Sequence, residues 1–211
     1  MMGHVVLLGD SVFDNGLYVP NGPAVGEQLR SILPKDWRVS MLARDGASTS
    51  GVAAQLNGVP ADATHLVISV GGNDALGYAY VVDDDQLSAT EAFVRLSEIQ
   101  REFEADYRAM LKGVLALGKS VAVCTVYDSV PGLRPEQRTA LSAWNDVILR
   151  QAFAAKLPVI DLRLVCSDAR DYSGVSPIEP SEIGGGKIVG AIRHLLLSDD
   201  PRVGTSRVYA S

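Results

Sequence analysis

Residues 4–11 read HVVLLGDS, and this stretch decides the fold. Residues 4–8 are almost entirely apolar and lack the alternation of a strand that has one face in water. A continuous apolar run of this length is typical of a strand covered on both faces, as in a parallel sheet. Gly9-Asp10-Ser11 follows the run at once. We therefore expect a buried strand that presents the Ser11 hydroxyl on the turn at its carboxyl end, although a helix cap or an ordinary turn would give the same pattern.

Strand-like apolar runs recur along the chain and alternate with segments of helical spacing. The expected strands after the first are residues 37–42, 65–70, 120–126 and 157–162. The expected helices are residues 23–33, 49–56, 88–117, 182–197 and a helix that begins at Pro135. This alternation indicates an α/β fold, a three-layer α/β/α sandwich around a mostly parallel five-stranded sheet. We expect one domain over residues 1–198 and a polar C-terminal tail over residues 199–211.

The longest predicted helix, residues 88–117, exceeds the length of the sheet. Its apolar side chains recur at steps of three and four, the pattern of an amphipathic helix, and Ser88 and Glu91 fit a capping box at its start. Such a helix would span ~45 Å, whereas a six-residue strand spans ~20 Å. We therefore expect a break or an overhang. The helix that begins at Pro135 has an apolar face that includes Trp144.

Composition narrows the class of protein. The net charge of −6 argues against nucleic-acid binding, which normally requires a basic face. No run of ~18 apolar residues is present, so we expect no membrane span. The N-terminus carries no targeting pattern, which predicts a cytoplasmic protein. Two cysteines, Cys124 and Cys166, exclude a disulfide scaffold and a four-cysteine zinc site. We expect free thiols, with a Cys124–Cys166 bridge as the alternative, and the sequence does not indicate an oligomeric state.

Two motifs could suggest a metal or a cofactor, and neither is convincing. Asp83-Asp84-Asp85 fits a solvated loop before a helix better than a divalent-ion site. Gly184-Gly185-Gly186-Lys187 lacks the first glycine of a phosphate loop, and Ile188 stands where serine or threonine should follow the lysine. No Gly-x-Gly-x-x-Gly motif follows the first strand. We therefore expect no cofactor and no metal.

Three loops at the predicted carboxyl edge of the sheet carry complementary polar groups. Ser11 follows the first strand, Gly46 follows residues 37–42, and Asn73 follows residues 65–70. Each loop alone would also fit an ordinary turn. Because the carboxyl ends of parallel strands meet at one edge, a hydroxyl, a backbone N–H and a side-chain amide would converge there. A serine nucleophile with an oxyanion hole requires this set of groups.

These motifs resemble those of the GDSL/SGNH hydrolases. Gly9-Asp10-Ser11 is similar to the first block of that family, Gly46 to the second, and Gly72-Asn73 to the third in looser spacing. The resemblance extends from residue 4 to about residue 197. It implies a flavodoxin-like sheet in the order 2-1-3-4-5 and Ser11 as nucleophile. It also implies an oxyanion held by the Ser11 N–H, the Gly46 N–H and the Asn73 side chain. The family's usual activity is metal-free hydrolysis of esters, including lipids, acetylated sugars and thioesters.

The fourth block of the family is altered in this chain. The family carries Asp-x-x-His before the last helix, whereas this sequence has Ser176-Pro177-Ile178-Glu179. The chain has only three histidines, His4, His65 and His194. Strand and helix geometry places His4 ~23 Å from Ser11, His65 ~26 Å from Asn73 and His194 ~20 Å beyond Glu179. A general base must lie within ~3 Å of the proton that it removes, so none of them fits.

Glu179 is the remaining candidate base. Its ordinary pKa of ~4.3 lies about two units below the ~6.5 of histidine, which corresponds to ~3 kcal/mol less proton affinity. Burial could raise that pKa. A protonated glutamate is neutral, however, and does not attract an oxyanion as a protonated histidine does. Glu179 could instead be a capping or salt-bridged loop carboxylate. Asp14, Asp168 and Asp171 are possible helpers without a spacing argument.

The sequence therefore predicts a weak or specialised serine hydrolase that acts on a small-molecule acyl ester or a related acyl bond. The predicted site consists of Ser11, Gly46, Asn73 and Glu179. We expect residues 127–133 to form a wall of the substrate site or an ordinary turn, and Tyr78 and Tyr80 to cover the site. The alternative is a ligand-binding module on the same fold that has lost its base and turns nothing over. A flavodoxin-like nucleotide binder is a more distant rival, because no phosphate-specific motif is present.

Overall fold

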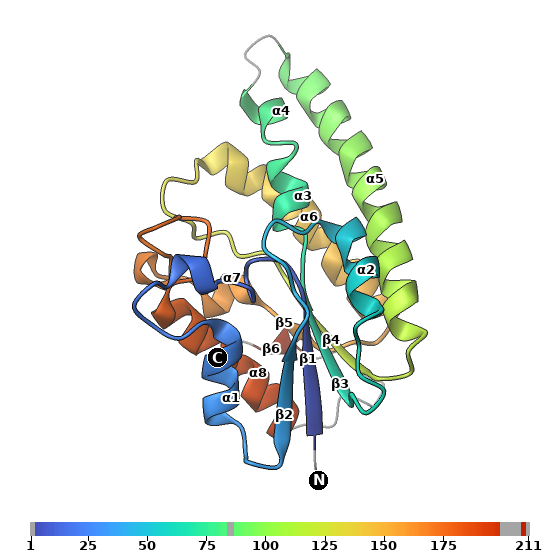
Figure 1. The fold of residues 1–211 in the computed structure, drawn as a ribbon. Helices are drawn as coiled ribbons and strands as arrows, with labels where there is room; N and C mark the ends of the chain where they lie inside the picture. Colours follow the sequence, from blue (N-terminus) through green and yellow to red (C-terminus); the bar gives the residue numbers. More distant parts are fainter. Residues whose placement is uncertain (1–2, 84–86, 199–207, 210–211) are drawn as a thin grey trace.

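The computed structural model describes residues 3–83, 87–198 and 208–209. A parallel sheet lies between two layers of helices, as predicted (Figure 1). The strands are β1 (Gly3–Gly9), β2 (Trp37–Met41), β3 (His65–Ser69), β4 (Ser120–Cys124), β5 (Val159–Ile160) and β6 (Val208–Tyr209). Their order is β2-β1-β3-β4-β5-β6. The predicted five-strand order 2-1-3-4-5 is confirmed, and β6 extends the sheet beyond β5.

Strand β6 modifies the prediction of a polar tail. Residues 208–209 pair in parallel with β5, with Val159 opposite Val208 and Ile160 opposite Tyr209. These two residues therefore belong to the sheet, whereas the sequence predicted no strand in this segment. Residues 199–207 and 210–211 lie outside the described part of the chain. The division into one domain and a tail stays a prediction.

The principal helices follow the predicted segments closely. They are α1 (Val25–Ile32), α2 (Val52–Leu56), α5 (Ala89–Leu115), α6 (Pro135–Ala154) and α8 (Glu182–Ser198). Short helical segments that the sequence pattern did not reveal are η1 (Gly16–Tyr18), α3 (Gly72–Leu76), α4 (Tyr80–Asp83), α7 (Leu162–Val165) and η3 (Ala169–Asp171). The turn η2 (Thr49–Gly51) leads into α2. Segments of three to five residues are too short to display a helical period, which explains why they were missed.

Helix α5 overhangs the sheet and is not broken. It runs without a break over 27 residues and begins with the predicted capping box of Ser88 and Glu91. Its N-terminal part extends beyond the carboxyl edge of the sheet together with α4 (Figure 1), whereas its C-terminal part packs against the sheet. The overhang is confirmed, and the helix gives one side of the molecule a wall that rises above the strand ends.

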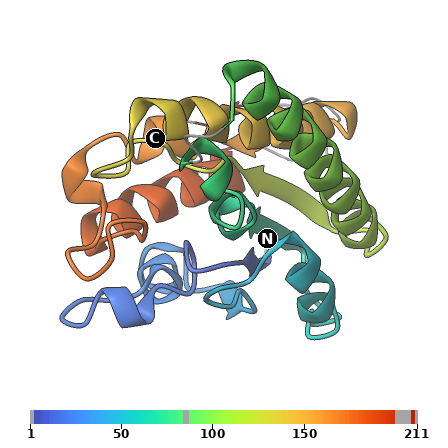
Figure 2. The same cartoon turned by 90° about the horizontal axis from the view of Figure 1, so that it is seen from above.

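The two faces of β1 belong to two separate cores. Val5 and Leu7 pack into a core with α1 and α8, while Val6 and Leu8 pack into a core with α2, α5 and α6. This double burial is why residues 4–8 are continuously apolar. Figure 2 views these layers from above.

Two further predictions concern a disulfide bond and a membrane span. Cys124 and Cys166 are both buried and free, so the alternative of a disulfide between them is wrong. Within residues 3–83, 87–198 and 208–209, no helix is both long enough and apolar enough to cross a membrane. The cytoplasmic location stays a prediction.

Candidate active site

The sheet brings the three predicted loops to one edge, because β1 lies between β2 and β3. Gly9 ends β1 with a positive φ of 121°, and a Cβ there would collide with the Ser69 carbonyl oxygen. Asp10 then donates its N–H to that same oxygen at 3.0 Å. Only glycine permits this close approach, which sets the turn that carries Ser11. The local reason for the position of Ser11 is thus the tight junction between β1 and β3.

Ser11 and Glu179 are hydrogen-bonded although 168 residues separate them in the chain. The Ser11 Oγ donates to Glu179 Oε1 at 3.0 Å, and the two residues are only 7% and 4% exposed. This is hydrogen-bonding reach for a base and the hydroxyl that it would deprotonate. The structure therefore places the Glu179 carboxylate within hydrogen-bonding distance of the Ser11 hydroxyl.

Two buried groups hold the loop that carries Glu179. The Asn15 side chain is fully buried, donates through Nδ2 to the Pro180 carbonyl at 3.1 Å and accepts from the backbone N–H of α1 through Oδ1. The Tyr127 hydroxyl donates to the Ile178 carbonyl at 2.6 Å. These hydrogen bonds fix the residues on both sides of Glu179, Ile178 and Pro180. Asn15 was not predicted as a site residue, because its only signal in the sequence is that of a polar residue four positions after Ser11.

The surroundings of Glu179 raise the pKa of its carboxyl group. Its pKa is raised to about 7, chiefly because burial disfavours the charged carboxylate. The nearby Asp45 carboxylate also raises the pKa, and the hydrogen bond from Ser11 opposes the rise. Glu179 Oε2 is buried and has no hydrogen-bond partner among the described residues. A base with a pKa near the operating pH combines a useful ionised fraction with useful proton affinity.

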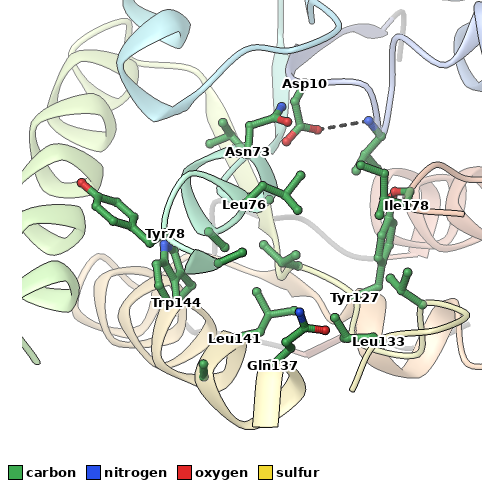
Figure 3. Close-up of a pocket in the computed structure, with 18 of the residues that line it drawn as sticks. Asp10, Asn73, Leu76, Tyr78, Tyr127, Leu133, Gln137, Leu141, Trp144 and Ile178 are labelled. Atoms are coloured by element: carbon green, nitrogen blue, oxygen red, sulfur yellow. Dashed lines mark hydrogen bonds between the residues drawn. The ribbon is translucent and has the colours of Figure 1, made fainter. Parts of the chain in front are cut away.

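Asp10 is a second carboxyl with a raised pKa beside Ser11. It is 3% exposed, and its pKa is raised to about 8, first of all by burial. The hydrogen bond from the Val12 N–H to Oδ1 opposes this shift, while the charges of Glu179 and Asp74 add to it. Asp10 and Glu179 thus change charge in neighbouring pH ranges. Asp10 and Asn73 line the same end of the pocket (Figure 3).

Asn73 and Gly46 occupy different surroundings. Asn73 lines the same pocket as Ser11 and donates one amide hydrogen to the Ala47 carbonyl at 2.9 Å. The amide has a second hydrogen that this bond leaves available. Gly46 lies on the exposed loop after β2 with a positive φ of 75°, and it is not among the pocket-lining residues. The structure therefore groups Ser11, Asn73 and Glu179 in one pocket and places Gly46 on the loop beside it.

The loops after β2 and β3 are tied together. The Asp74 carboxylate accepts from the Thr49 backbone N–H at 3.0 Å and from the Thr49 hydroxyl at 3.1 Å. Together with the bond from Asn73 to Ala47, this link fixes the Gly46 loop relative to Asn73. The two predicted oxyanion donors outside Ser11 are thus positioned by one shared network.

The pocket beside Ser11 has a cavity volume of about 150 Å³ and a mostly apolar lining (Figure 3). One end is polar, with Asp10, Ser11, Asn73 and Glu179. The rest of the wall comes from α3, the start of α4, α5, α6 and the loop after β4. It includes Val70, Leu76, Tyr78, Val81, Leu96, Ile99, Val126, Val130, Leu133, Leu141, Trp144 and Ile178. The overhanging end of α5 therefore forms part of the pocket wall.

Some of the residues predicted to form the wall and the cover of the site line the pocket, and others do not. Tyr127, Val130 and Leu133 line the pocket, so the loop after β4 forms part of the pocket wall, and its contact with a substrate stays a prediction. Tyr78 lines the pocket, whereas Tyr80 is 54% exposed and is not among the lining residues. The cover formed by this segment is therefore partial. Two aspartates of the predicted loop at 83–85 lie outside the described residues.

The histidines and the candidate helper carboxylates lie elsewhere. His4 and His65 lie at the amino ends of β1 and β3, the edge of the sheet opposite Ser11, and His194 lies on α8. Asp14 accepts from the Asp45 N–H, Asp168 pairs with Arg170, and Asp171 pairs with Lys187. Within the described residues, none of these three carboxylates hydrogen-bonds Glu179. No group of three or more histidine, cysteine or acidic side chains in the described part of the chain could hold a metal ion.

Solved structures of lipases and related hydrolases share this fold. A lipase from a goat rumen metagenome aligns with a TM-score of 0.71 at 20% identity, over 90% of this chain and 96% of that one. Phospholipase A1 from Streptomyces albidoflavus NA297 aligns with a TM-score of 0.66 at 20% identity, over 95% and 100% of the two chains. The lipase/acylhydrolase from Enterococcus faecalis aligns with a TM-score of 0.65 at 20% identity, over 95% and 99%.

These similarities define the class of fold, that of the lipases and esterases with a 2-1-3-4-5 sheet. The sequence model of the GDSL-like lipase/acylhydrolase family matches residues 7–184. The chain therefore belongs to the GDSL-like lipase/acylhydrolase family, and the resemblance drawn from Gly9-Asp10-Ser11 is confirmed. No curated protein matches the chain.

Proposed function

We propose that this protein is a serine hydrolase that cleaves an ester or a related acyl bond, with Ser11 as nucleophile and Glu179 as base. The observation that carries the proposal is the 3.0 Å hydrogen bond from the Ser11 hydroxyl to Glu179, at the polar end of an apolar pocket. The membership of the GDSL-like family supports the same chemistry.

In the acylation step, the Ser11 proton moves to Glu179 Oε1 while Ser11 Oγ forms a bond to the substrate carbonyl carbon. The electron pair of the carbonyl moves to its oxygen, and the Ser11 N–H, the Gly46 N–H and the Asn73 amide would stabilise that oxyanion. Glu179 then gives its proton to the departing alkoxide as the acyl–oxygen bond breaks. Glu179 then takes a proton from a water molecule, whose oxygen forms a bond to the acyl carbon of the acyl-enzyme. As the bond from that carbon to Ser11 Oγ breaks, Glu179 returns the proton to Ser11 Oγ and the acid is released.

A glutamate changes the electrostatics of this reaction. The carboxylate charge on Glu179 disappears as the oxyanion appears, so negative charge moves across the site without a new ion pair. In a histidine enzyme the imidazolium attracts the oxyanion, whereas neutral Glu179 offers no such attraction. The raised pKa of about 7 compensates for the low basicity of an ordinary glutamate. We expect a slower enzyme than one with the family's histidine.

The pocket supports an apolar acyl group as the bound part of the substrate. Leucine, isoleucine, valine and aromatic side chains form most of its wall, and they come both from helices α3 to α6 and from the loops at the carboxyl edge of the sheet. Burial of an apolar chain there contributes roughly 0.8 kcal/mol per CH₂ group. The names of the aligned structures, a lipase, a phospholipase A1 and a lipase/acylhydrolase, agree with such a substrate.

The experiment that tests this function compares two serines. Hydrolysis of short-chain and medium-chain p-nitrophenyl esters is measured for the wild type, Ser11→Ala and Ser40→Ala. Ser40 is the matched control, because its hydroxyl hydrogen-bonds His4 at the opposite edge of the sheet. We expect Ser11→Ala to lose at least about 1,000-fold in kcat/KM, and Ser40→Ala to retain the activity.

A second candidate function rests on the unpartnered Oε2 of Glu179. No residue of the described chain orients this carboxyl as the family's aspartate orients histidine. The second candidate is a binding module that holds an acyl ligand and does not cleave it. Equal inertness of the wild type and Ser11→Ala toward every ester, with thermal stabilisation of both by the corresponding carboxylic acids, would establish the module and refute the hydrolase.

A further inference from the structure

Gln137 places a polar side chain in the apolar part of the pocket wall. It is the third residue of α6, it is half-buried, and it lines the same pocket as Ser11. Figure 3 shows it at the end of the pocket away from Asp10. Leu141, one helical turn further along α6, lines the pocket beside it. An amide at this place is unexpected in a wall that otherwise fits a hydrocarbon chain.

The two ends of the Gln137 amide differ in their surroundings. Oε1 accepts the backbone N–H of Arg134 at 3.1 Å, a bond that caps the first turn of α6 and fixes the amide. Nε2 carries two hydrogens, and no described residue accepts either of them. Trp144 Nε1, on the same helix, is fully buried, whereas Gln137 Nε2 is not. The nitrogen of Gln137 is therefore free to donate to a bound molecule.

The hydroxyl groups of the two tyrosines in the pocket wall are already donors to protein atoms. The Tyr127 hydroxyl donates to the Ile178 carbonyl at 2.6 Å, and the Tyr78 hydroxyl donates to Glu102 Oε2 at 3.4 Å. Among the described lining residues away from the strand ends, Gln137 is thus the side chain with accessible hydrogens left to donate. An acyl chain that extends from Ser11 along the apolar wall meets this amide at its far end.

The charges of the pocket select the kind of acceptor. None of the described residues that line the pocket is a lysine or an arginine, and Asp10 and Glu179 line its other end. A carboxylate at the far end of the acyl chain would lose water without gaining an ion pair, which is unfavourable. A methyl end would remove water from Gln137 Nε2 and leave it without an acceptor. A neutral oxygen avoids both penalties.

We propose that the substrate's acyl group is an apolar chain that carries a neutral oxygen acceptor at its far end, a ketone or hydroxyl oxygen, and that Gln137 Nε2 binds this oxygen. The inference rests on the proposed function, because it assigns the acyl group to this pocket. Gln137 is then a residue that determines specificity for the acyl end, at the opposite end of the pocket from the reacting carbonyl.

The test uses p-nitrophenyl esters of increasing acyl length, each ended by an alkyl group, a methyl ketone or a carboxylate. At the length that reaches Gln137, we expect the wild type to favour the methyl ketone over the alkyl end by about tenfold in kcat/KM. Gln137→Leu removes the amide and should abolish this preference. Gln137→Glu keeps an oxygen for the Arg134 N–H but removes the donor, so it should abolish the preference without loss of the helix cap.

Gln151→Leu is the matched control. Gln151 is a half-buried glutamine of the same helix, it donates to Glu104 at 3.1 Å, and it is not among the described residues that line the pocket. This variant should keep the preference for the methyl ketone.

The outcomes separate this inference from the proposed function. Hydrolysis by the wild type without a preference for the ketone at any length, or with a preference for the carboxylate end, overturns the inference and leaves the hydrolase intact. A preference that persists in Gln137→Glu also overturns it. Failure to hydrolyse any ester refutes the hydrolase. Calorimetry with the free acids then decides the inference, which requires tighter binding of one ketone-ended acid than of its alkyl counterpart by the wild type and not by Gln137→Glu. Any other binding result overturns it.

Discussion

The two edges of the sheet each hold a serine hydroxyl bonded to a titratable side chain, and they differ in everything around it. At the amino edge, His4 Nε2 lies 2.8 Å from Ser40 Oγ, and His4 Nδ1 lies 3.2 Å from Asp62 Oδ1. At the carboxyl edge, the Ser11 hydroxyl bonds Glu179 and no other side chain among the described residues. The amino edge thus has the Ser–His–Asp order of a catalytic triad, while the carboxyl edge lacks histidine.

The surroundings of the two serines nevertheless favour Ser11 over Ser40 as a nucleophile. Ser40 lies within β2 opposite Val6 of β1, so its backbone is part of the sheet rather than of a turn. His4, Ser40 and Asp62 join β1, β2 and the loop before β3, which is a structural link between three elements. Ser11 lies on a turn at the polar end of a pocket, beside the loop amide of Asn73. The comparison teaches that a site is defined by the cavity and the donors around a nucleophile more than by its partner's residue type.

After the loss of Ser11 itself, the largest effect at the carboxyl edge should come from Glu179→Gln. The amide can still accept the Ser11 hydrogen bond but cannot take the proton, so we expect kcat/KM to fall by about 100-fold to 10,000-fold. Asp62→Asn makes the same chemical change at the amino edge and should leave ester hydrolysis unaltered. Steady-state assays of both variants decide between the edges, and a loss confined to Asp62→Asn would reverse our assignment.

Restoring the family's pattern should act in the opposite direction. The double variant Ser176→Asp with Glu179→His would supply a base that becomes cationic as the oxyanion forms. We expect a gain of roughly tenfold in kcat/KM at neutral pH, from the added electrostatic stabilisation. The same assay measures it. A double variant that folds normally, as judged by circular dichroism, and has less activity than Glu179→Gln would count against the position of the base.

The pH dependence of the reaction should report the two buried carboxyls. Glu179 must be ionised to act as a base, so kcat/KM should rise with pH up to about 7, by roughly tenfold per unit below that value. Asp10 gains a negative charge beside Asn73 as pH passes about 8, and this charge opposes the oxyanion, so the activity should fall again. Asp10→Asn should remove the alkaline fall. A profile that is flat from pH 5 to pH 9 contradicts both assignments.

A smaller effect is expected from loss of the hydrogen bond by which Tyr127 holds the Glu179 loop. Tyr127→Phe removes the 2.6 Å hydrogen bond to the Ile178 carbonyl and keeps the ring. We expect a loss of about 1 kcal/mol of stability and a fall in kcat with little change in KM, since the base is displaced while the pocket wall remains. Equal changes in kcat/KM for Tyr127→Phe and for Tyr80→Phe, which lies outside the pocket lining, would argue against a positioning role.

The parts of the molecule that the sequence predicted are those fixed by local pattern. Continuous apolar runs located the strands, and the apolar stripe with the Ser88 and Glu91 box located α5 and its overhang. The conjunction of Ser11, Gly46 and Asn73 pointed to the edge of the sheet at which the pocket lies, and their catalytic roles stay a prediction. The segments α3 and α4 were missed because they are too short for periodicity, and β6 was missed because two residues carry no strand pattern.

The partners of buried polar groups could not be predicted, because tertiary packing alone decides them. Glu179 was identified by its place in an altered motif, but its burial and its bond to Ser11 depend on a loop clamped by Asn15 and Tyr127. Trp144 looked like any apolar residue on a helix face, and only the folded structure shows that its buried N–H has no partner among the described residues. Local periodicity reports which face is buried and does not report what a buried donor meets.

The central claim, that Ser11 is the nucleophile and Ser40 is not, is tested most directly by covalent labelling. The protein is treated with a fluorophosphonate, and peptide mapping by mass spectrometry locates the modified serine. We expect a single adduct on Ser11, formed faster as pH rises toward about 7 and lost in Glu179→Gln. An adduct on Ser40, or none on Ser11 at any pH at which esters are hydrolysed, would contradict it.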